Sequence, residues 1–156
     1  MSALYSVKTG TTVTALVAGT GKTLVNLISG ANRIPLITQF AISFDGVTAS
    51  AVPVLVEPSY CTQGAAGTPG TSPTPSLLRG KGASQSTAGV DYSAEPTTIT
   101  PYDHMLVTPN GGLFVLQFPL GREPEADLSG GTNKAQLIRG TAPANVNCRA
   151  SAQFEE

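Results

Sequence analysis

The chain has 156 residues, and 12% of them are charged, which is about half the usual share; the formal net charge is −1. This length fits one domain with a substantial core, and the near-neutral charge gives no electrostatic field that would draw the chain to nucleic acid or to anionic lipid. The apolar runs are too short to span a bilayer and no secretory signal opens the sequence, so we expect a soluble protein made in a cytoplasm.

Short stretches of strand-forming residues, separated by turn residues, make up most of the sequence. Twelve prolines and 17 glycines interrupt every stretch that is long enough for a helix. We expect strands at 4–9, 12–18, 22–29, 34–44, 51–57, 104–108, 112–119, 134–140 and 144–154. Eight or nine short strands at this spacing predict an all-β chain, folded as an antiparallel β-sandwich or barrel of jelly-roll type. We expect a single domain over residues 1–156.

The alternation of apolar and polar residues predicts which side chains form the core. In the last strand the apolar side chains share one face: Val146, Cys148, Ala150, Ala152 and Phe154. Pro53 predicts an edge strand or a bulge, because proline lacks the N–H group that a central strand needs. The pair Asn110-Gly111 predicts a hairpin turn. The candidates for a helical turn are Glu123–Leu128 and Ser76–Leu78.

The segment 62–101 differs in composition from the rest of the chain. Gly, Pro, Ser and Thr supply 24 of its 40 residues, and it has few large apolar side chains. Such a segment buries too little surface to offset the entropy that is lost when it becomes ordered. We therefore expect an extended loop at 62–101, with a partner surface that holds the loop in place.

The sequence from Ala18 to Thr23, Ala-Gly-Thr-Gly-Lys-Thr, is the nearest approach to a phosphate-binding loop. That motif needs a glycine five residues before Gly21, where Leu16 stands, and it needs a helix afterwards. A β-prone stretch follows here instead. We therefore interpret the segment as a hairpin turn and expect no nucleotide hydrolysis.

His104, next to Asp103, is the only histidine. Nothing in the sequence identifies the further acid or nucleophile that a catalytic pair needs, and one histidine without a Cys/His cluster does not make an ordinary zinc site. We expect that the chain is not an enzyme and holds no metal and no other cofactor. Cys61 and Cys148 are expected to be buried thiols, because a cytoplasm is reducing; one disulfide is the alternative.

Glu123, Glu125 and Asp127 form an acidic run. Carboxylates on one side of an extended segment can bind calcium, but the run lacks the Asp-rich, glycine-turned spacing of a calcium loop. We expect a solvated or intersubunit charge cluster paired with Arg122, Lys134 or Arg139, and calcium binding is the alternative.

Aromatic side chains are few, with four tyrosines, five phenylalanines and no tryptophan. A platform on which sugars or bases stack therefore has little material. The four tyrosines, Tyr5, Tyr60, Tyr92 and Tyr102, are the residues available for an aromatic patch.

Leu77 and Leu78, followed by Arg79 and Lys81, are the sharpest candidates for contact with a partner. Two leucines flanked by cations inside a polar segment are costly to expose to water, and they suit an anchor in a neighbour's groove. The alternative is that they fold back on the chain's own sandwich.

Three sequences in the last third of the chain carry a resemblance. They are the Pro-Leu-Gly-Arg-Glu-Pro turn at 119–124, the Arg-Gly-Thr-Ala-Pro loop at 139–143, and the final strand, which ends in Phe-Glu-Glu at 156. With them the chain resembles small virion proteins of tailed bacteriophages, in particular those that decorate the outer capsid surface or form minor capsid components.

The resemblance implies a β-sandwich subunit, trimeric with copies of itself, that binds the major capsid protein on the outer surface of the virion and reinforces the shell. It implies no catalytic residue. The interface that we expect in this interpretation consists of Tyr5, Leu77, Leu78, Arg79, Lys81, Tyr92, Arg122, Glu123 and Arg139. The low charge agrees with it, because a surface so poor in charge is expected to be covered by neighbours. The alternative is a tail- or fibre-associated β-sandwich that recognises a host surface glycan.

Overall fold

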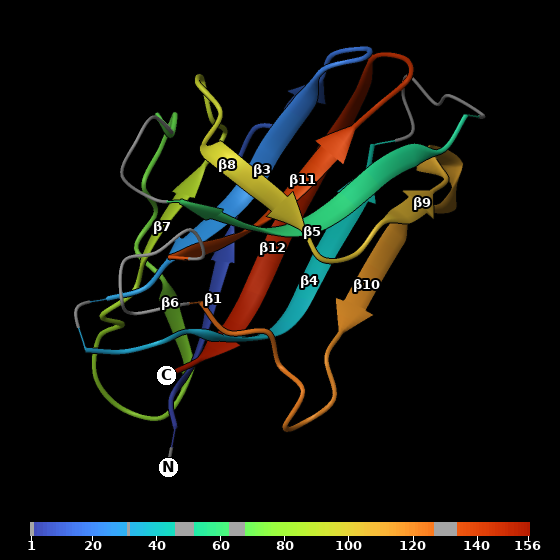
Figure 1. Ribbon diagram of the computed structural model, residues 1–156. Coiled ribbons are helices and arrows are strands. Elements are labelled where there is room, and N and C mark those ends of the chain that lie inside the picture. Colours follow the sequence, from blue (N-terminus) through green and yellow to red (C-terminus); the bar gives the residue numbers. More distant parts are fainter. Residues whose placement is uncertain (1, 31, 46–51, 63–67, 127–133) are drawn as a thin grey trace.

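The computed structural model of the chain describes residues 2–30, 32–45, 52–62, 68–126 and 134–156. These residues form two six-stranded sheets, and every strand pair is antiparallel. The sheets face each other (Figure 1), and the described part of the chain contains no α-helix. The predicted antiparallel β-sandwich is therefore confirmed.

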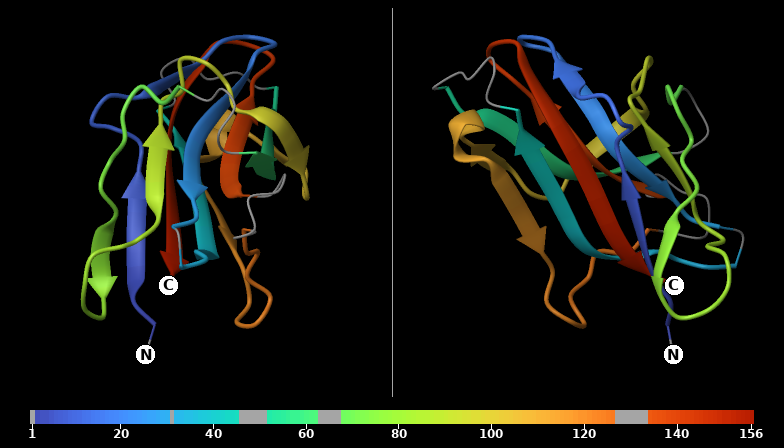
Figure 2. Two further views of the ribbon diagram at one scale, coloured as in Figure 1. Left: turned by 60° about the vertical axis from the view of Figure 1, so that its left-hand side comes forward. Right: turned by 180° about the vertical axis from the view of Figure 1, so that it is seen from behind.

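Sheet A has the strand order β10-β4-β12-β1-β6, and β2 pairs with β12 beyond the end of β1. Its strands are β1 (Leu4–Lys8), β2 (Thr14–Leu16), β4 (Leu36–Phe44), β6 (Ser76–Arg79), β10 (Leu113–Gln117) and β12 (Val146–Glu155). Seen from behind, β10 forms one lateral edge of this sheet and β6 the other (Figure 2).

Sheet B has the strand order β7-β3-β11-β5-β8, and β9 pairs with another part of β5. Its strands are β3 (Gly21–Ile28), β5 (Val54–Thr62), β7 (Thr87–Val90), β8 (Thr97–Pro101), β9 (Met105–Val107) and β11 (Ala135–Thr141). The expected strands outside 62–101 therefore all occur, with shifts of a few residues at their ends.

The core between the sheets contains the side chains that the alternating pattern predicts. The five alternating apolar residues of β12 are all buried, with the polar residues between them partly or fully exposed. The neighbouring strand β4 and the facing strands of sheet B complete the core with Leu24, Leu27, Phe40, Ile42, Val54, Val56 and Ile138. At one end the ring of Tyr5 stacks on Phe154, with 5.5 Å between the ring centroids. Burial of one side chain of this size stabilises the fold by roughly 1.5–3 kcal/mol.

Two turns that we predicted as hairpins instead carry the chain from one sheet to the other. The 3-10 turn Pro109–Gly111 links β9 in sheet B to β10 in sheet A, and the turn between Val17 and Thr20 links β2 in sheet A to β3 in sheet B. Both hairpin predictions are wrong, because a local turn signal does not specify which sheet the next strand joins.

The prediction of an edge strand from Pro53 is also wrong. Pro53 stands before the first residue of β5, Val54, so its missing N–H group takes no part in the ladder. The strand itself lies inside sheet B, with β11 on one side and β8 and β9 on the other.

The segment 62–101, predicted as a loop, contains three strands. β6 adds to sheet A beside β1, β7 adds to sheet B beside β3, and β8 pairs with β5. Isolated bridges join Thr68 to Ala94 and Thr71 to Val90. The prediction fails because strands of small residues need no core of their own when they pair with the edge of an existing sheet.

Neither candidate for a helical turn is helical in the described residues. Ser76–Leu78 lies in β6. Residues 123–126 are extended, and Glu125 forms an isolated bridge with Leu36 of β4. Residues 127 and 128 lie outside the described part of the chain.

Contacts with the chain's own sheets hold the described part of the segment 62–101, which we call the inserted segment. The Tyr92 hydroxyl accepts a hydrogen bond from Asn26 Nδ2 at 3.0 Å, on the face of sheet B that points away from the main core. The carboxylate of Glu95 accepts hydrogen bonds from the backbone N–H group of Thr23 at 2.9 Å and from its hydroxyl at 2.5 Å. At the chain end, the Glu156 carboxylate accepts the N–H group of Ser86 at 3.1 Å. These contacts lie within the chain, and the expected partner surface stays a prediction.

Candidate interface on the outer face of sheet A

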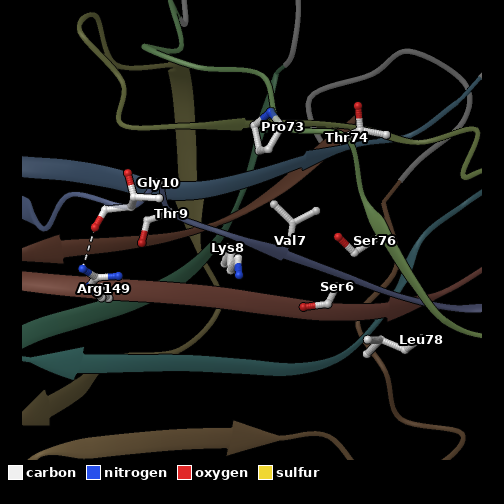
Figure 3. A pocket seen from close by; sticks show the side chains of 11 residues that line it. Ser6, Val7, Lys8, Thr9, Gly10, Pro73, Thr74, Ser76, Leu78 and Arg149 are labelled. Atoms are coloured by element: carbon white, nitrogen blue, oxygen red, sulfur yellow. Dashed lines mark hydrogen bonds between the residues drawn. The ribbon is translucent and has the colours of Figure 1, made fainter.

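The outer face of sheet A is hollowed at two adjoining places. The larger hollow, of about 430 Å³, lies between β1 and the residues that lead into β6 (Figure 3). The smaller hollow, of about 210 Å³, lies over β12 and β4 and reaches β10. Lys8, Thr9 and Arg149 line both hollows, so we call the combined depression the sheet A groove.

Strand alternation brings the two cations of the groove together. Lys8 pairs across the ladder with Ser151 of β12, and Arg149 lies two residues from Ser151 on the same face of that strand. Ala150, between them, points into the core. Arg149 is held in place because its Nη2 donates a hydrogen bond to the backbone carbonyl of Thr11 at 2.6 Å (Figure 3).

The groove is cationic at its centre and apolar at its margins. No Asp or Glu is among its lining residues. Leu78 of β6 contributes one margin and Leu113 of β10 the other, and their side chains are 53% and 68% exposed. A surface or segment that carries carboxylates and apolar side chains fits such a groove, because both charge attraction and apolar contact are available.

The predicted interface residues on β6 do lie at the surface. Leu77 and Leu78 are both exposed, and Leu78 lines the groove. Arg79 Nη2 pairs with Glu155 Oε1 of β12 at 2.5 Å, across β1. The segment folds back on its own sandwich as a strand, and its two leucines stay exposed, so contact with a partner stays a prediction.

The structure corrects the prediction that Tyr5 and Tyr92 belong to the interface. Their side chains are only 4% and 2% exposed, so they cannot form the surface of a partner site. Tyr5 points into the core because it alternates with the exposed residues of β1. Tyr92 is buried by its own segment, which folds back over Asn26.

Lys81 and Arg139 lie on other parts of the molecule and line neither hollow of the groove. Lys81 lines a separate hollow of about 500 Å³ beside the chain ends, together with Arg33 and Glu156. Arg139 lies on β11, in the middle of sheet B. Its guanidinium packs against Gly21, where a Cβ atom would come within 2.4 Å of Cζ.

Arg122 and Glu123 lie in the turn after β10. The Glu123 carboxylate accepts a backbone N–H group of the same turn at 2.7 Å. The two ion pairs of the described residues involve neither Arg122 nor Lys134 nor Arg139, so the expected pairing of the acidic run does not form within the described part of one chain. Asp127 lies outside the described residues. Within the described ranges, no three His, Cys, Asp or Glu side chains are grouped as metal ligands would be.

His104 has a partner that the sequence did not identify. Its Nδ1 lies 3.1 Å from Oε1 of Glu57, a buried residue of β5, and its backbone N–H group donates to Asp103 Oδ1 at 2.8 Å. Glu57 is the one acid in the expected strand at 51–57, and an acid in an otherwise apolar strand is the signal in the sequence that could have indicated a partner for His104. The pairing of β5 with β9 brings the two residues together, and that pairing is not visible in the local sequence.

Both cysteines are free and buried, as predicted. Burial raises the pKa of the Cys61 thiol to about 11, because little solvent is present to stabilise a thiolate. The Cys61 thiol donates a hydrogen bond to Asn26 Oδ1 at 3.7 Å. Burial likewise raises the pKa of the Cys148 thiol to about 12.

The Gly-Lys-Thr sequence lies in a strand, as expected from its β-prone surroundings. Gly21 begins β3, and Lys22 and Thr23 continue it, so no helix N-terminus follows. A hollow of about 180 Å³ lies beside this segment, but the Glu95 carboxylate in it already accepts the backbone N–H group of Thr23. This N–H group is therefore not available to bind an anion, and the Glu95 carboxylate beside it would repel one.

Only two of the four tyrosines come together. The ring centroids of Tyr60 and Tyr102 are 4.8 Å apart, and that of Phe118 lies 6.5 Å from Tyr102. Burial raises the pKa of Tyr102, and the neighbouring Tyr60 adds to this effect. Because Tyr5 and Tyr92 are buried elsewhere, a patch of all four tyrosines does not exist.

No family model, no curated protein and no solved structure matches the chain. Among the described residues no helix is long and apolar enough to cross a membrane.

Proposed function

We propose that the chain is a structural virion protein, a capsid decoration or minor capsid subunit that binds the outer shell of a tailed phage and stabilises it. The sheet A groove is the observation that carries the proposal. It places Lys8 and Arg149 together, with no Asp or Glu among the lining residues, between exposed leucines at two margins. This composition fits docking to another protein, and in this proposal the major capsid protein supplies carboxylates and apolar side chains to the groove.

We further infer that the sandwich is of the jelly-roll type. The order of the strands supports this: β1 and β2 lie together in sheet A, and from β2 to β5 the chain alternates between the sheets. β8 and β9 together follow β5 in sheet B, and β10, β11 and β12 alternate again. In this proposal the strands make two Greek keys, and β6 and β7 add one strand at an edge of each sheet. Jelly rolls occur in viral capsid domains, and this likeness supports the proposal only at the level of fold.

In this proposal the protein stabilises the shell by mass action. A protein that binds the assembled shell, and not its free subunits, stabilises the shell by its binding free energy, and many copies on one symmetric particle act together. The trimer implied by the resemblance is a prediction within this proposal.

Co-sedimentation of the purified protein with mature phage shells tests the proposal. We expect the wild type to pellet with shells, and the double variant Lys8→Glu with Arg149→Glu to bind at least about tenfold more weakly, because two attractive charges become repulsive. The matched control reverses two cations that lie outside both the groove and the expected interface, Lys22→Glu with Arg33→Glu, and should bind like the wild type.

Circular dichroism of each variant shows whether it is folded. A wild type that stays in the supernatant, or a folded groove variant that pellets normally, contradicts the proposal. Binding of the wild type to a glycan array, without binding to shells, would support the host-surface alternative.

A further inference from the structure

One lateral edge of sheet A is open to pairing. β10 pairs with β4 in an uninterrupted register from Leu113 to Gln117, and no described strand pairs with its other side. It is the outermost strand of its sheet in both figures of the whole chain (Figures 1 and 2). An unpaired edge presents rows of N–H and C=O groups on which a further strand can form.

The backbone groups on the open side belong to Leu113, Val115 and Gln117. The Phe118 N–H group donates to the Thr38 carbonyl at 3.0 Å and therefore points toward β4. Hydrogen-bonding groups alternate in direction along an antiparallel strand, so the even-numbered residues of β10 point toward β4 and the odd-numbered ones away from it. Three N–H groups and three C=O groups are thus directed outward.

Three further edge strands carry features that discourage pairing. β6 has a bulge against β1 and ends in the charged Arg79. β8 has an irregular register with β5, holds Thr98 at a φ of 53° and ends in Pro101. The outer side of β7 is occupied by the bridge between Thr71 and Val90. Charges, bulges, prolines and covering segments are the devices by which natural sheets prevent association at their edges.

β10 has none of these devices. Its sequence, Leu-Phe-Val-Leu-Gln, contains no charge and no proline, and its register with β4 has no bulge. The side chains of Leu113 and Val115 are 68% and 43% exposed. An edge that is both unprotected and apolar is suited to a permanent partner strand.

We propose that β10 pairs with β10 of a second copy of this chain, antiparallel about a two-fold axis at Val115. The three outward residues are symmetric about Val115, so Val115 pairs with its counterpart and Leu113 with Gln117, which satisfies every outward group. Pro109 and Pro119 flank the strand and limit the ladder to the same five residues in both copies.

The occupant is a second copy because β10 is complementary to itself. It has no charge that would repel an identical strand, and the exposed leucine and valine of the two copies meet on one face beside the axis. The interface is isologous, as in most homodimers. Sheet A then runs without interruption through both copies, and its groove is repeated on each.

Analytical ultracentrifugation of the full chain over a wide concentration range tests the pairing. The wild type is expected to form a dimer. Val115→Pro is expected to raise the dissociation constant at least about tenfold, because it removes the central donor. The variant keeps its fold, since the Val115 N–H group has no partner among the described residues and an edge strand accepts proline there.

Val115→Lys supplies a second disruptive variant, because Val115 faces its own copy at the axis and two cations would then lie side by side. Val17→Lys is the matched control: this valine is 57% exposed and follows β2, and β12 and β4 stand between β2 and β10, so the dimer should form as in the wild type.

A wild type that is monomeric at every concentration overturns the proposal, and so does a trimer that Val115→Pro leaves intact. A hexamer that Val115→Pro divides into trimers supports it. The result is separate from shell binding, because Lys8→Glu with Arg149→Glu leaves the β10 edge unchanged and should leave the dimer intact.

Discussion

Glu95 ties the inserted segment to sheet B through one carboxylate. It accepts both the backbone N–H group and the hydroxyl of Thr23, in a part-buried position. Glu95→Ala leaves these two donors without their acceptor, and we expect the free energy of unfolding to fall by about 1–3 kcal/mol in urea titrations. Glu123→Ala is the control, because its carboxylate accepts a hydrogen bond in an exposed turn, and a change within about 0.5 kcal/mol is expected. Equal losses in both variants would contradict this account of Glu95.

The two buried thiols predict a loss of stability in alkali. In the unfolded chain a cysteine ionises with a pKa of about 8.5, whereas burial raises the pKa of Cys61 to about 11 and that of Cys148 to about 12. The unfolded state therefore loses these protons first, so their contribution is complete below about pH 8 and is lost as the pH rises toward 11 and 12.

Urea midpoints measured between neutral pH and about pH 10.5 test this prediction. We expect the midpoint to fall, and to fall less in the double variant Cys61→Ala with Cys148→Ala. The raised pKa of Tyr102 acts in the same direction, so part of the decrease should persist in that variant. A midpoint that is constant across this range would show that the thiols are not protected by burial.

At the scale of residues, the sequence predicts the burial of a side chain when that burial follows from the pattern of its own strand. It does not predict contacts between distant segments. The inward residues of β12 follow from a period of two, and the structure confirms them. Tyr5 and Tyr92 were assigned to a surface because tyrosine suits both a core and an interface, and only the packing of distant segments decides between them. The contact of His104 with Glu57 depends on strand pairing, which no local pattern encodes.

At the scale of elements, β7 shows how closely the inserted segment packs. A Cβ atom at Gly89 would lie 2.4 Å from the Tyr92 hydroxyl and 3.0 Å from Pro69 Cβ. We expect Gly89→Ala to destabilise the protein by about 1–3 kcal/mol, because the ring of Tyr92 must move and its hydrogen bond to Asn26 is disturbed. Thr87→Ala, at an exposed position of the same strand, should change stability by no more than about 0.5 kcal/mol.

Thermal unfolding with circular dichroism measures both variants. A Gly89→Ala protein as stable as the Thr87→Ala protein would mean that Tyr92 is free to move aside. Such a result would contradict the close packing of the segment on sheet B.

The strands that the sequence predicted and those that it missed differ in their source of stability. The expected strands outside 62–101 have large apolar residues at alternating positions, and their pattern is visible without knowledge of their partners. β6, β7 and β8 have few such residues, and they exist because β1, β3 and β5 offer sheet edges to them. The turn at 109–111 was likewise recognised as a turn, but its role as a connection between sheets depends on where β10 pairs.

At the scale of the whole molecule, the inserted segment joins both sheets and should not unfold alone. It adds β6 to sheet A and β7 to sheet B. Its Glu95 carboxylate and its Tyr92 hydroxyl also accept hydrogen bonds from Thr23 and Asn26 of sheet B. We expect one cooperative transition, in which far-ultraviolet circular dichroism and tyrosine fluorescence coincide. A tyrosine signal that changes at lower urea concentration would show that the segment is a separate unit.

The groove and the open edge belong to this scale, and the sequence did not predict either. The groove needs β1, β4 and β12 side by side, although β4 and β12 are separated by most of the chain. The expected contact segment at 77–81 includes one margin of it, Leu78, because two adjacent leucines next to cations in a polar segment stand out in the sequence. Lys8 and Arg149 are ordinary surface cations in the sequence and become a pair only through the register of β1 with β12.

The pairing of β1 with β12 at Ala3 and Glu156 decides how the fold responds to mechanical tension. The N–H group of Ala3 donates to the carbonyl of Glu156 at 3.0 Å, and the N–H group of Glu156 donates back at 3.1 Å, at the end of this antiparallel pair. Tension applied between these two residues pulls the strands apart sideways, so the hydrogen bonds of the ladder break one after another. Tension directed along the strands of sheet A loads all bonds of a ladder in parallel. We therefore expect the fold to yield at a lower force in the first direction than in the second.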